Sequence, residues 1–181
     1  GTFMKKTNLR RSSLVAAVSV AASVVATSLV SMSAQAASLT QVLVRFDRMK
    51  ASTATTGTVC AKPATVGTEA DVQVVFPTGY TVSGTAGNWT VNTTNTGWPT
   101  GGTAWLGIGT ATTASGQTVT FPSSDLTVGT LYCFNWSNSA ALSITSSVAA
   151  SNSGTITTRT SVPATIDSAT YSTASISDDQ I

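Results

Sequence analysis

The two cysteines, Cys60 and Cys133, carry the most reactive side chains of this 181-residue chain. A cysteine attacks as a nucleophile through its thiolate, which is usually generated by a neighbouring histidine, and the chain contains no histidine. A metal site would need further soft ligands beside the two thiolates. A disulfide is therefore a better interpretation of these residues than a catalytic thiol or a metal centre.

Tryptophan offers a second kind of chemistry, the stacking of sugar rings on an aromatic face. Trp98 precedes a proline and lies between glycines in the loop-rich stretch "NWTVNTTNTGWPTGGTAW", which also contains Trp89 and Trp105. Aromatic residues on irregular loops are frequent contact residues. We name Trp98, Trp89 and Trp105 as candidate glycan-binding residues. The alternative is that Trp98 covers one end of the fold.

The acidic residues do not form an evident catalytic pair. There are seven in all, whereas glycoside hydrolysis requires two carboxylates that flank a cleft. Glu69 and Asp71 are expected on one face at the start of a strand. The chain has no calcium-loop, phosphate-loop, dinucleotide-binding or G-x-S-x-G motif. We therefore expect a protein that is not an enzyme and that has neither a cofactor nor a metal site.

Residues 1–36 have the pattern of a secretory signal peptide, with residues 1–3 as an upstream remnant before Met4. Four basic residues precede the uncharged apolar stretch 14–32, and Ala34-Gln35-Ala36 provides an A-x-A cleavage site. We expect an N-terminal signal helix that is cleaved after Ala36. An uncleaved membrane anchor remains open, because the apolar stretch is just long enough to span a bilayer.

Export determines the redox state and charge of the remaining chain. An oxidising compartment favours pairing of the only two cysteines, Cys60 with Cys133. Removal of residues 1–36 takes away four of nine basic and none of seven acidic residues, so the net charge becomes 5 − 7 = −2. We expect a secreted or cell-surface protein that does not bind nucleic acid. It would touch a membrane only through an uncleaved signal segment.

Residues 37–181 are expected to form a single all-β domain. Short runs alternate apolar and polar residues between glycine, proline, asparagine and serine. Three examples are "LTQVLVRF" from Leu39, "ADVQVVF" from Ala70 and "LYCFNW" from Leu131. In the last, Tyr132, Phe134 and Trp136 share one face, which is more often core than a sugar platform. The ending at Ile181 leaves open whether the domain is truncated there.

Threonine and serine strengthen the β prediction. Residues 37–181 contain 31 threonines and 18 serines. Threonine is β-branched and fits a half-buried sheet surface, where it can cover the wet face without a charge. The recurring apolar residues argue against a disordered serine/threonine-rich linker.

Cys60 in "GTVCAK" and Cys133 in "GTLYCFNW" resemble the cysteine pair of the immunoglobulin-like (Ig-like) β-sandwich domains of secreted bacterial surface proteins. The resemblance covers Leu39 to Tyr171 and implies an Ig-like antiparallel β-sandwich without catalytic residues. The chain departs from the family pattern because Trp89 lies 29 residues after Cys60 and Tyr132 directly precedes Cys133. If the Tyr132 face is the core, the disulfide lies on the outer face or at an edge.

These features favour a non-catalytic structural or interaction protein, such as a subunit of a surface coat, fibre or adhesin stalk. Its partners would be other surface-protein subunits. In one version, the strand at Leu39–Met49 pairs with an open sheet edge of a neighbouring subunit. The alternatives are a carbohydrate-binding module that uses the loop tryptophans, with extracellular glycans as partners, and an ice- or mineral-binding sheet with T-x-T runs.

Overall fold

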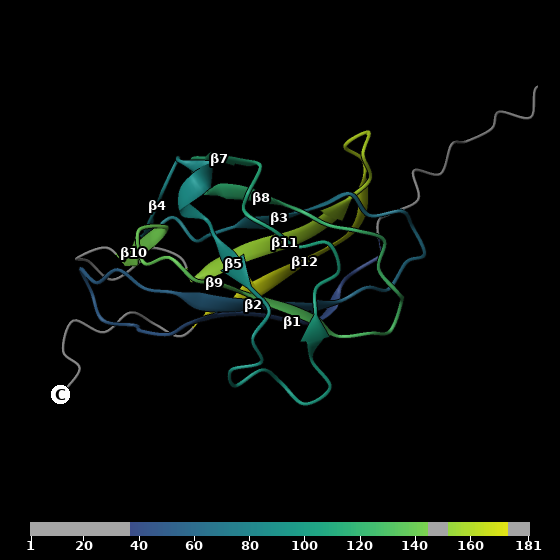
Figure 1. Ribbon diagram of the computed structural model, residues 1–181, viewed down its shortest axis with the longest axis horizontal. Coiled ribbons are helices and arrows are strands. Elements are labelled where there is room, and N and C mark those ends of the chain that lie inside the picture. Colours follow the sequence, from purple (N-terminus) through teal and green to yellow (C-terminus); the bar gives the residue numbers. More distant parts are fainter. Residues whose placement is uncertain (1–36, 145–151, 174–181) are drawn as a thin grey trace, which may run out of the picture. The chain divides into compact units, whose positions relative to one another are not determined.

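The computed structural model describes residues 37–144 and 152–173, which are all-β (Figure 1). They contain twelve strands, one short 3-10 turn, η1 (Ala86–Asn88), and no α-helix. The predicted signal helix, with Ala34 and Ala36, lies outside the described residues.

One five-stranded sheet, here called the disulfide sheet, contains both cysteines. Its order is β1 (Thr40–Phe46), β2 (Gly57–Lys62), β9 (Tyr132–Trp136) and β5 (Val91–Asn92), and β6 (Thr103–Ala104) also pairs with β9. These pairs are antiparallel except β6–β9, which is parallel. β5 and β6 are only two residues long, and the polar segment 93–102 connects them.

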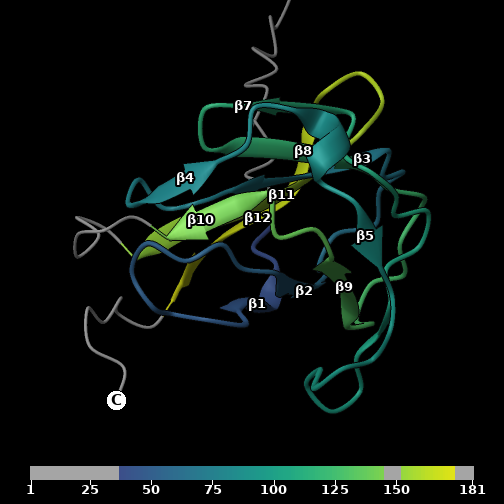
Figure 2. The ribbon, with the colours of Figure 1, turned by 60° about the vertical axis from the view of Figure 1, so that its left-hand side comes forward.

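The second five-stranded sheet, here called the opposite sheet, is antiparallel throughout. Its order is β12 (Thr165–Ser172), β11 (Ser153–Arg159), β3 (Asp71–Val75), β8 (Thr118–Pro122) and β7 (Thr113–Ser115). A separate antiparallel pair, β4 (Tyr80–Val82) with β10 (Leu142–Ile144), lies side by side in Figure 2.

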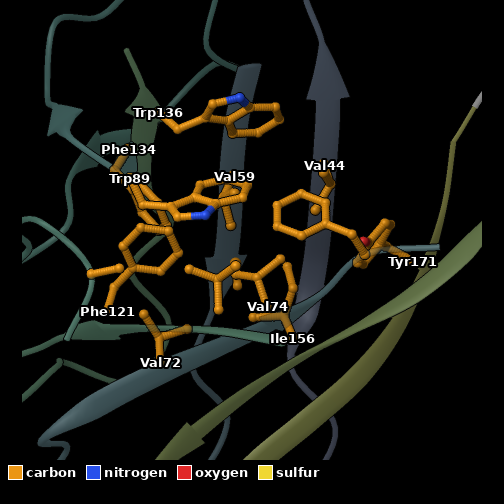
Figure 3. Close-up of a cluster of buried hydrophobic side chains, with 14 of the residues drawn as sticks. Val44, Val59, Val72, Val74, Trp89, Phe121, Phe134, Trp136, Ile156 and Tyr171 are labelled. Carbon is orange, nitrogen blue, oxygen red and sulfur yellow. The ribbon is translucent and has the colours of Figure 1, made fainter. Parts of the chain in front are cut away.

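Both five-stranded sheets contribute side chains to one hydrophobic core (Figure 3). The disulfide sheet provides Val44, Val59, Phe134 and Trp136, and the opposite sheet provides Val72, Val74, Phe121, Ile156 and Tyr171. Trp136 contacts the rings of Phe46, Phe76 and Trp89 at centroid distances of 5.5, 5.6 and 6.1 Å. A core enclosed by two sheets is compatible with a β-sandwich.

The alternation seen in the sequence determines which face of each strand is buried. Tyr132, Phe134 and Trp136 are all buried in the core, as predicted. Val44 and Phe46 are buried as well, whereas Val42 stays partly exposed, beside an irregularity in the β1–β2 register between Thr40 and Leu43. Period-two patterning therefore identified the core faces of these strands.

The outer face of the β11–β12 hairpin is covered by hydroxyl groups. Thr157 and Ser168 lie opposite each other with their hydroxyl oxygens 2.8 Å apart, and those of Ser153 and Ser172 are 3.3 Å apart. These pairs satisfy polar groups across the strands without any charge. They account for the high threonine and serine content of this edge of the sheet.

Candidate functional site: the disulfide face and its covering loop

The disulfide joins two adjacent strands of one sheet. Cys60 on β2 and Cys133 on β9 are directly opposed in the antiparallel register, with their Cα atoms 4.1 Å apart. The predicted pairing is thus present in the structure, and it is consistent with an oxidising, extracellular location. In Ig domains the bond instead connects the two sheets. The difference follows from the position of Cys133 between the core residues Tyr132 and Phe134, which turns its side chain away from the core.

A loop covers the disulfide on the outer face of the sheet. Cys60 and Cys133 are fully buried and form a small apolar cluster with Leu131, against which Leu43 and Trp98 pack. Trp98 belongs to residues 93–102, which we call the covering loop. Trp98 therefore covers the cluster that contains the disulfide and is itself only partly exposed to solvent.

Arg45 fastens the covering loop to strand β1. Its guanidinium donates to the carbonyl oxygens of Gly97 (2.6 Å) and Thr96 (3.1 Å), and to the hydroxyl of Thr58 (3.2 Å). Gly97 has a φ of 65°, in the left-handed region that glycine adopts without a steric penalty. A charged donor on two consecutive carbonyls fixes the loop backbone close to the sheet.

Asn135 fastens the same loop to strand β9. Its Oδ1 accepts from the Trp98 indole (2.9 Å) and the Thr58 hydroxyl (2.7 Å). Its Nδ2 donates to Asn92 Oδ1 (2.9 Å) and the Thr94 carbonyl (2.8 Å). Every hydrogen-bonding position of the amide is occupied. The sequence Asn135-Trp136-Ser137 has the N-x-[ST] pattern of a glycosylation site, but the amide nitrogen of Asn135 is engaged in hydrogen bonds within the fold.

The structure places the three candidate tryptophans in different surroundings. Trp89 and Trp105 are buried in the core, and their indole nitrogens donate to the Ser83 carbonyl (3.0 Å) and the Ser123 hydroxyl (2.9 Å). Figure 3 shows Trp89 among the core side chains. Neither ring faces solvent. The loop-rich local sequence suggested surface positions, but η1 directs Trp89 inward, where it stacks on Phe76 at 5.1 Å.

A polar groove lies beside the covering loop and was not identified from the sequence. It has a volume of about 310 Å³, and its lining includes Asp47, Thr56, Thr58, Asn92, Thr94 and Asn135. The Thr56 hydroxyl donates to Oδ2 of Asp47. Asn92 Oδ1 is held by Asn135 and by the Thr94 backbone N–H (3.2 Å), which leaves the Asn92 amide group as a donor at the groove. The groove thus combines a fixed acceptor, the Asp47 carboxylate, with a fixed donor, the Asn92 amide group.

The acidic residues at the start of β3 occupy two unrelated environments. Asp71 forms a bidentate ion pair with Arg159 on β11, with both N–O distances 2.8 Å. Glu69 is buried, and its Oε2 accepts from the Leu126 backbone N–H (2.9 Å). Burial raises the pKa of the Glu69 carboxyl above its ordinary range, and the neighbouring Asp125 adds to the increase. The two acids do not converge on a cleft.

The described part of the chain offers no metal cluster and no membrane-spanning helix. No group of three or more acidic, cysteine or histidine side chains could hold a metal ion within residues 37–144 and 152–173. Within the same two ranges, no helix has the length and hydropathy to cross a membrane. Comparisons with protein families, with curated proteins and with solved structures found no match to this chain.

Proposed function

We propose that this chain is a secreted, non-catalytic structural or interaction protein of the cell surface, with an Ig-like β-sandwich as its domain. It would serve as a subunit of a surface coat, fibre or adhesin stalk. The observation that carries the proposal is the edge strand β12. With eight residues it is the longest described strand, and it lies at one end of the opposite sheet.

The chemistry of β12 favours pairing with another strand. The Ser168 N–H donates to the Ala37 carbonyl (3.2 Å), so it points away from β11. By alternation, the Thr170 N–H points the same way. Proteins usually protect such edges with lysine, proline or a bulge, whereas the exposed side chains of β12 are threonines and a serine. Ala37 occupies this edge only at Ser168, and the exposed, uncharged side chains of Thr170 and Ser172 beyond it support pairing between subunits.

The space next to this edge is apolar enough to take part in the contact. A groove of about 180 Å³ lies between β1 and the end of β12, and it is lined by Leu43, Val44, Phe46, Met49 and Ser172, among others. A strand added to β12 would cover it. β1 itself pairs with β2 of the same chain, so exchange of the strand at 39–49 would require β1 to leave this ladder. We therefore favour addition of a second copy at β12.

Size-exclusion chromatography and negative-stain microscopy of residues 37–181 under oxidising conditions test the proposal. Fibres, sheets or regular oligomers are the expected result. Thr170→Lys should abolish them, because a charge on the edge strand opposes pairing. Thr113→Lys is the matched control, since Thr113 is an exposed threonine on β7 at the other end of the same sheet. A monomer at all concentrations, or equal effects of both variants, would contradict pairing through β12.

The polar groove supports a second candidate function, the binding of a neutral carbohydrate. Asp47 supplies an acceptor and Asn92 a donor, the pair of groups that neighbouring sugar hydroxyls require. Trp98 is the one of the three named tryptophans that reaches the surface, and its indole is bound to Asn135 of the groove lining. The candidate carbohydrate site is therefore the groove lined by hydroxyl and amide groups, and not a platform of exposed tryptophans.

A glycan array followed by calorimetric titration tests the second function. Saturable binding that is lost in Asn92→Ala and Asp47→Asn is the expected result. Thr113→Ala, an exposed polar position on the opposite sheet, should leave binding unchanged. An array without signal from the folded protein would remove this candidate.

A further inference from the structure

Asp167 is a fully buried acidic residue, and one of its oxygens has no hydrogen-bond partner among residues 37–144 and 152–173. It lies near the start of β12, and its Oδ2 accepts from the backbone N–H groups of Ala64 (2.8 Å) and Thr65 (3.0 Å). Its Oδ1 is buried without a hydrogen bond. A buried carboxylate oxygen without a partner is energetically costly. A hydrogen-bond donor or a cation next to Asp167 Oδ1 would remove this cost.

The backbone neighbour of Asp167 is Ala37. The two residues form an isolated parallel β-bridge, in which the Ala37 carbonyl accepts from the Ser168 N–H. Residues paired in this way lie about 4.8 Å apart and direct their side chains to the same face. The Asp167 carboxyl group therefore lies close to the Ala37 backbone.

Ala37 is also the residue that follows the predicted cleavage site. Hydrolysis of the Ala36–Ala37 peptide bond adds one water: the Ala36 carbonyl carbon gains an oxygen and becomes a carboxylate, and the Ala37 nitrogen becomes an α-ammonium group. One amide N–H is thereby replaced by a cation with three N–H donors.

We propose that Asp167 is the buried counter-ion of the mature N-terminus, so that the α-ammonium of Ala37 binds Asp167 Oδ1 once the signal peptide has been removed. The inference rests on the export and cleavage that belong to the proposed function. The basic residue on the neighbouring strand β11, Arg159, is already bound to Asp71. Removal of the signal peptide would then stabilise the folded domain in addition to separating it from residues 1–36.

A double-mutant cycle tests the proposal on purified chains. The described strands and their core all lie within residues 37–173, so the comparison uses residues 37–181 with a free amine and residues 35–181, which keep Gln35 and Ala36. Each is made with Asp167 and with Asp167→Asn. With Asp167, the extension should raise the unfolding equilibrium constant about tenfold. In the Asp167→Asn background, it should have little effect. Equal effects in both backgrounds would overturn the proposal.

Two further variants keep the test decisive. If Asp167→Asn does not fold, Nα-acetylation of residues 37–181 removes the same charge without touching the core. It should destabilise the chain about as much as the extension, and an unchanged stability would refute the ion pair. Glu69→Gln is the matched control, because Glu69 Oε1 is also buried without a hydrogen bond but Glu69 forms no bridge with Ala37. It should show no coupling to the N-terminus.

The N-terminal sequence of the exported protein separates this inference from the function on which it rests. A chain that begins at Ala37 supports cleavage after Ala36, whereas an uncleaved chain contradicts that cleavage and the secreted form of the proposed protein. The cycle on purified chains remains interpretable in either case. A correct N-terminus without coupling to Asp167 would refute only the counter-ion.

Discussion

Cys60 and Cys133 face each other across neighbouring antiparallel strands, with their side chains on the side of the sheet away from the core. The bond closes a chain separation of 73 residues but adds no link between the two five-stranded sheets. Its contribution is therefore to hold β2 beside β9 and to restrict the unfolded chain. Cohesion between the sheets depends on the aromatic core.

Loss of the disulfide should lower stability while leaving the fold recognisable. From the loop length, the chain-entropy relation gives a cost of about 4 kcal/mol. Urea unfolding of the oxidised protein and of the Cys60→Ala/Cys133→Ala variant, followed by circular dichroism, measures the difference. An unchanged midpoint would show that the bond is not formed in the native protein.

Trp98→Ala should accelerate reduction of the disulfide far more than it lowers stability. Trp98 packs against the buried cluster that contains the disulfide, so its removal should open a path for a thiolate to reach the sulfur atoms. The rate of thiol release in dithiothreitol is the measurement. Asn135→Ala, which removes the hydrogen bonds that hold the covering loop, should also accelerate reduction of the disulfide. If both variants are reduced at the wild-type rate, the loop does not protect the bond.

Trp89→Ala, in contrast to Trp98→Ala, is expected to lower stability strongly. Its ring is fully buried against Phe76 and Trp136, so its truncation should cost about 3–5 kcal/mol. Thermal unfolding compared with Trp98→Ala distinguishes a core residue from a loop residue. A smaller loss for Trp89→Ala than for Trp98→Ala would contradict the placement of these two side chains.

Gly57→Ala should destabilise the fold through a steric clash. A Cβ atom at Gly57 would collide with the Trp136 ring and the Arg45 carbonyl oxygen, and overpacking of this kind costs about 1–3 kcal/mol. Gly84→Ala is the control, because a Cβ atom at Gly84 would meet no heavy atom within 4 Å. Denaturant midpoints of the two variants give the comparison, and a neutral Gly57→Ala would exclude the close approach.

Glu69 should make the protein less stable as the pH rises. Burial raises its pKa in the folded state, so the unfolded chain releases the proton first. Its favourable contribution is complete below the ordinary pKa near 4.5 and is lost as the pH rises through the folded-state value. Glu69→Gln should flatten this decline. Unfolding free energies of both proteins from about pH 4 to about pH 8 provide the test, and parallel curves would contradict it.

The period-two alternation of the sequence predicted those strands that bury one face in the core. The alternation of Tyr132, Phe134 and Trp136 placed them in the core and put Cys133 on the other face. The serine and threonine pairs of β11 and β12 follow from the same period of two. In these strands each side chain's environment depends on its immediate neighbours, so the sequence pattern is sufficient.

The site could not be predicted in the same way because long-range contacts build it. Asn135 meets Asn92 and Trp98 from positions 43 and 37 residues away, and nothing in the sequence pairs them. Trp89 and Trp98 stand in similar polar, loop-rich surroundings, yet one is core and the other covers the disulfide. Which way such a loop folds depends on the surfaces it meets.

Tyr171 gives the edge of the opposite sheet a mechanical property. From β12 its side chain passes over Gly154 on β11, where a Cβ would collide with it, and its hydroxyl donates to the Val75 carbonyl on β3 (2.7 Å). One side chain thus ties together three strands. If β12 pairs with a second copy as proposed, a pulling force on it would be shared with the interior strand β3, and β12 would be braced against being peeled away.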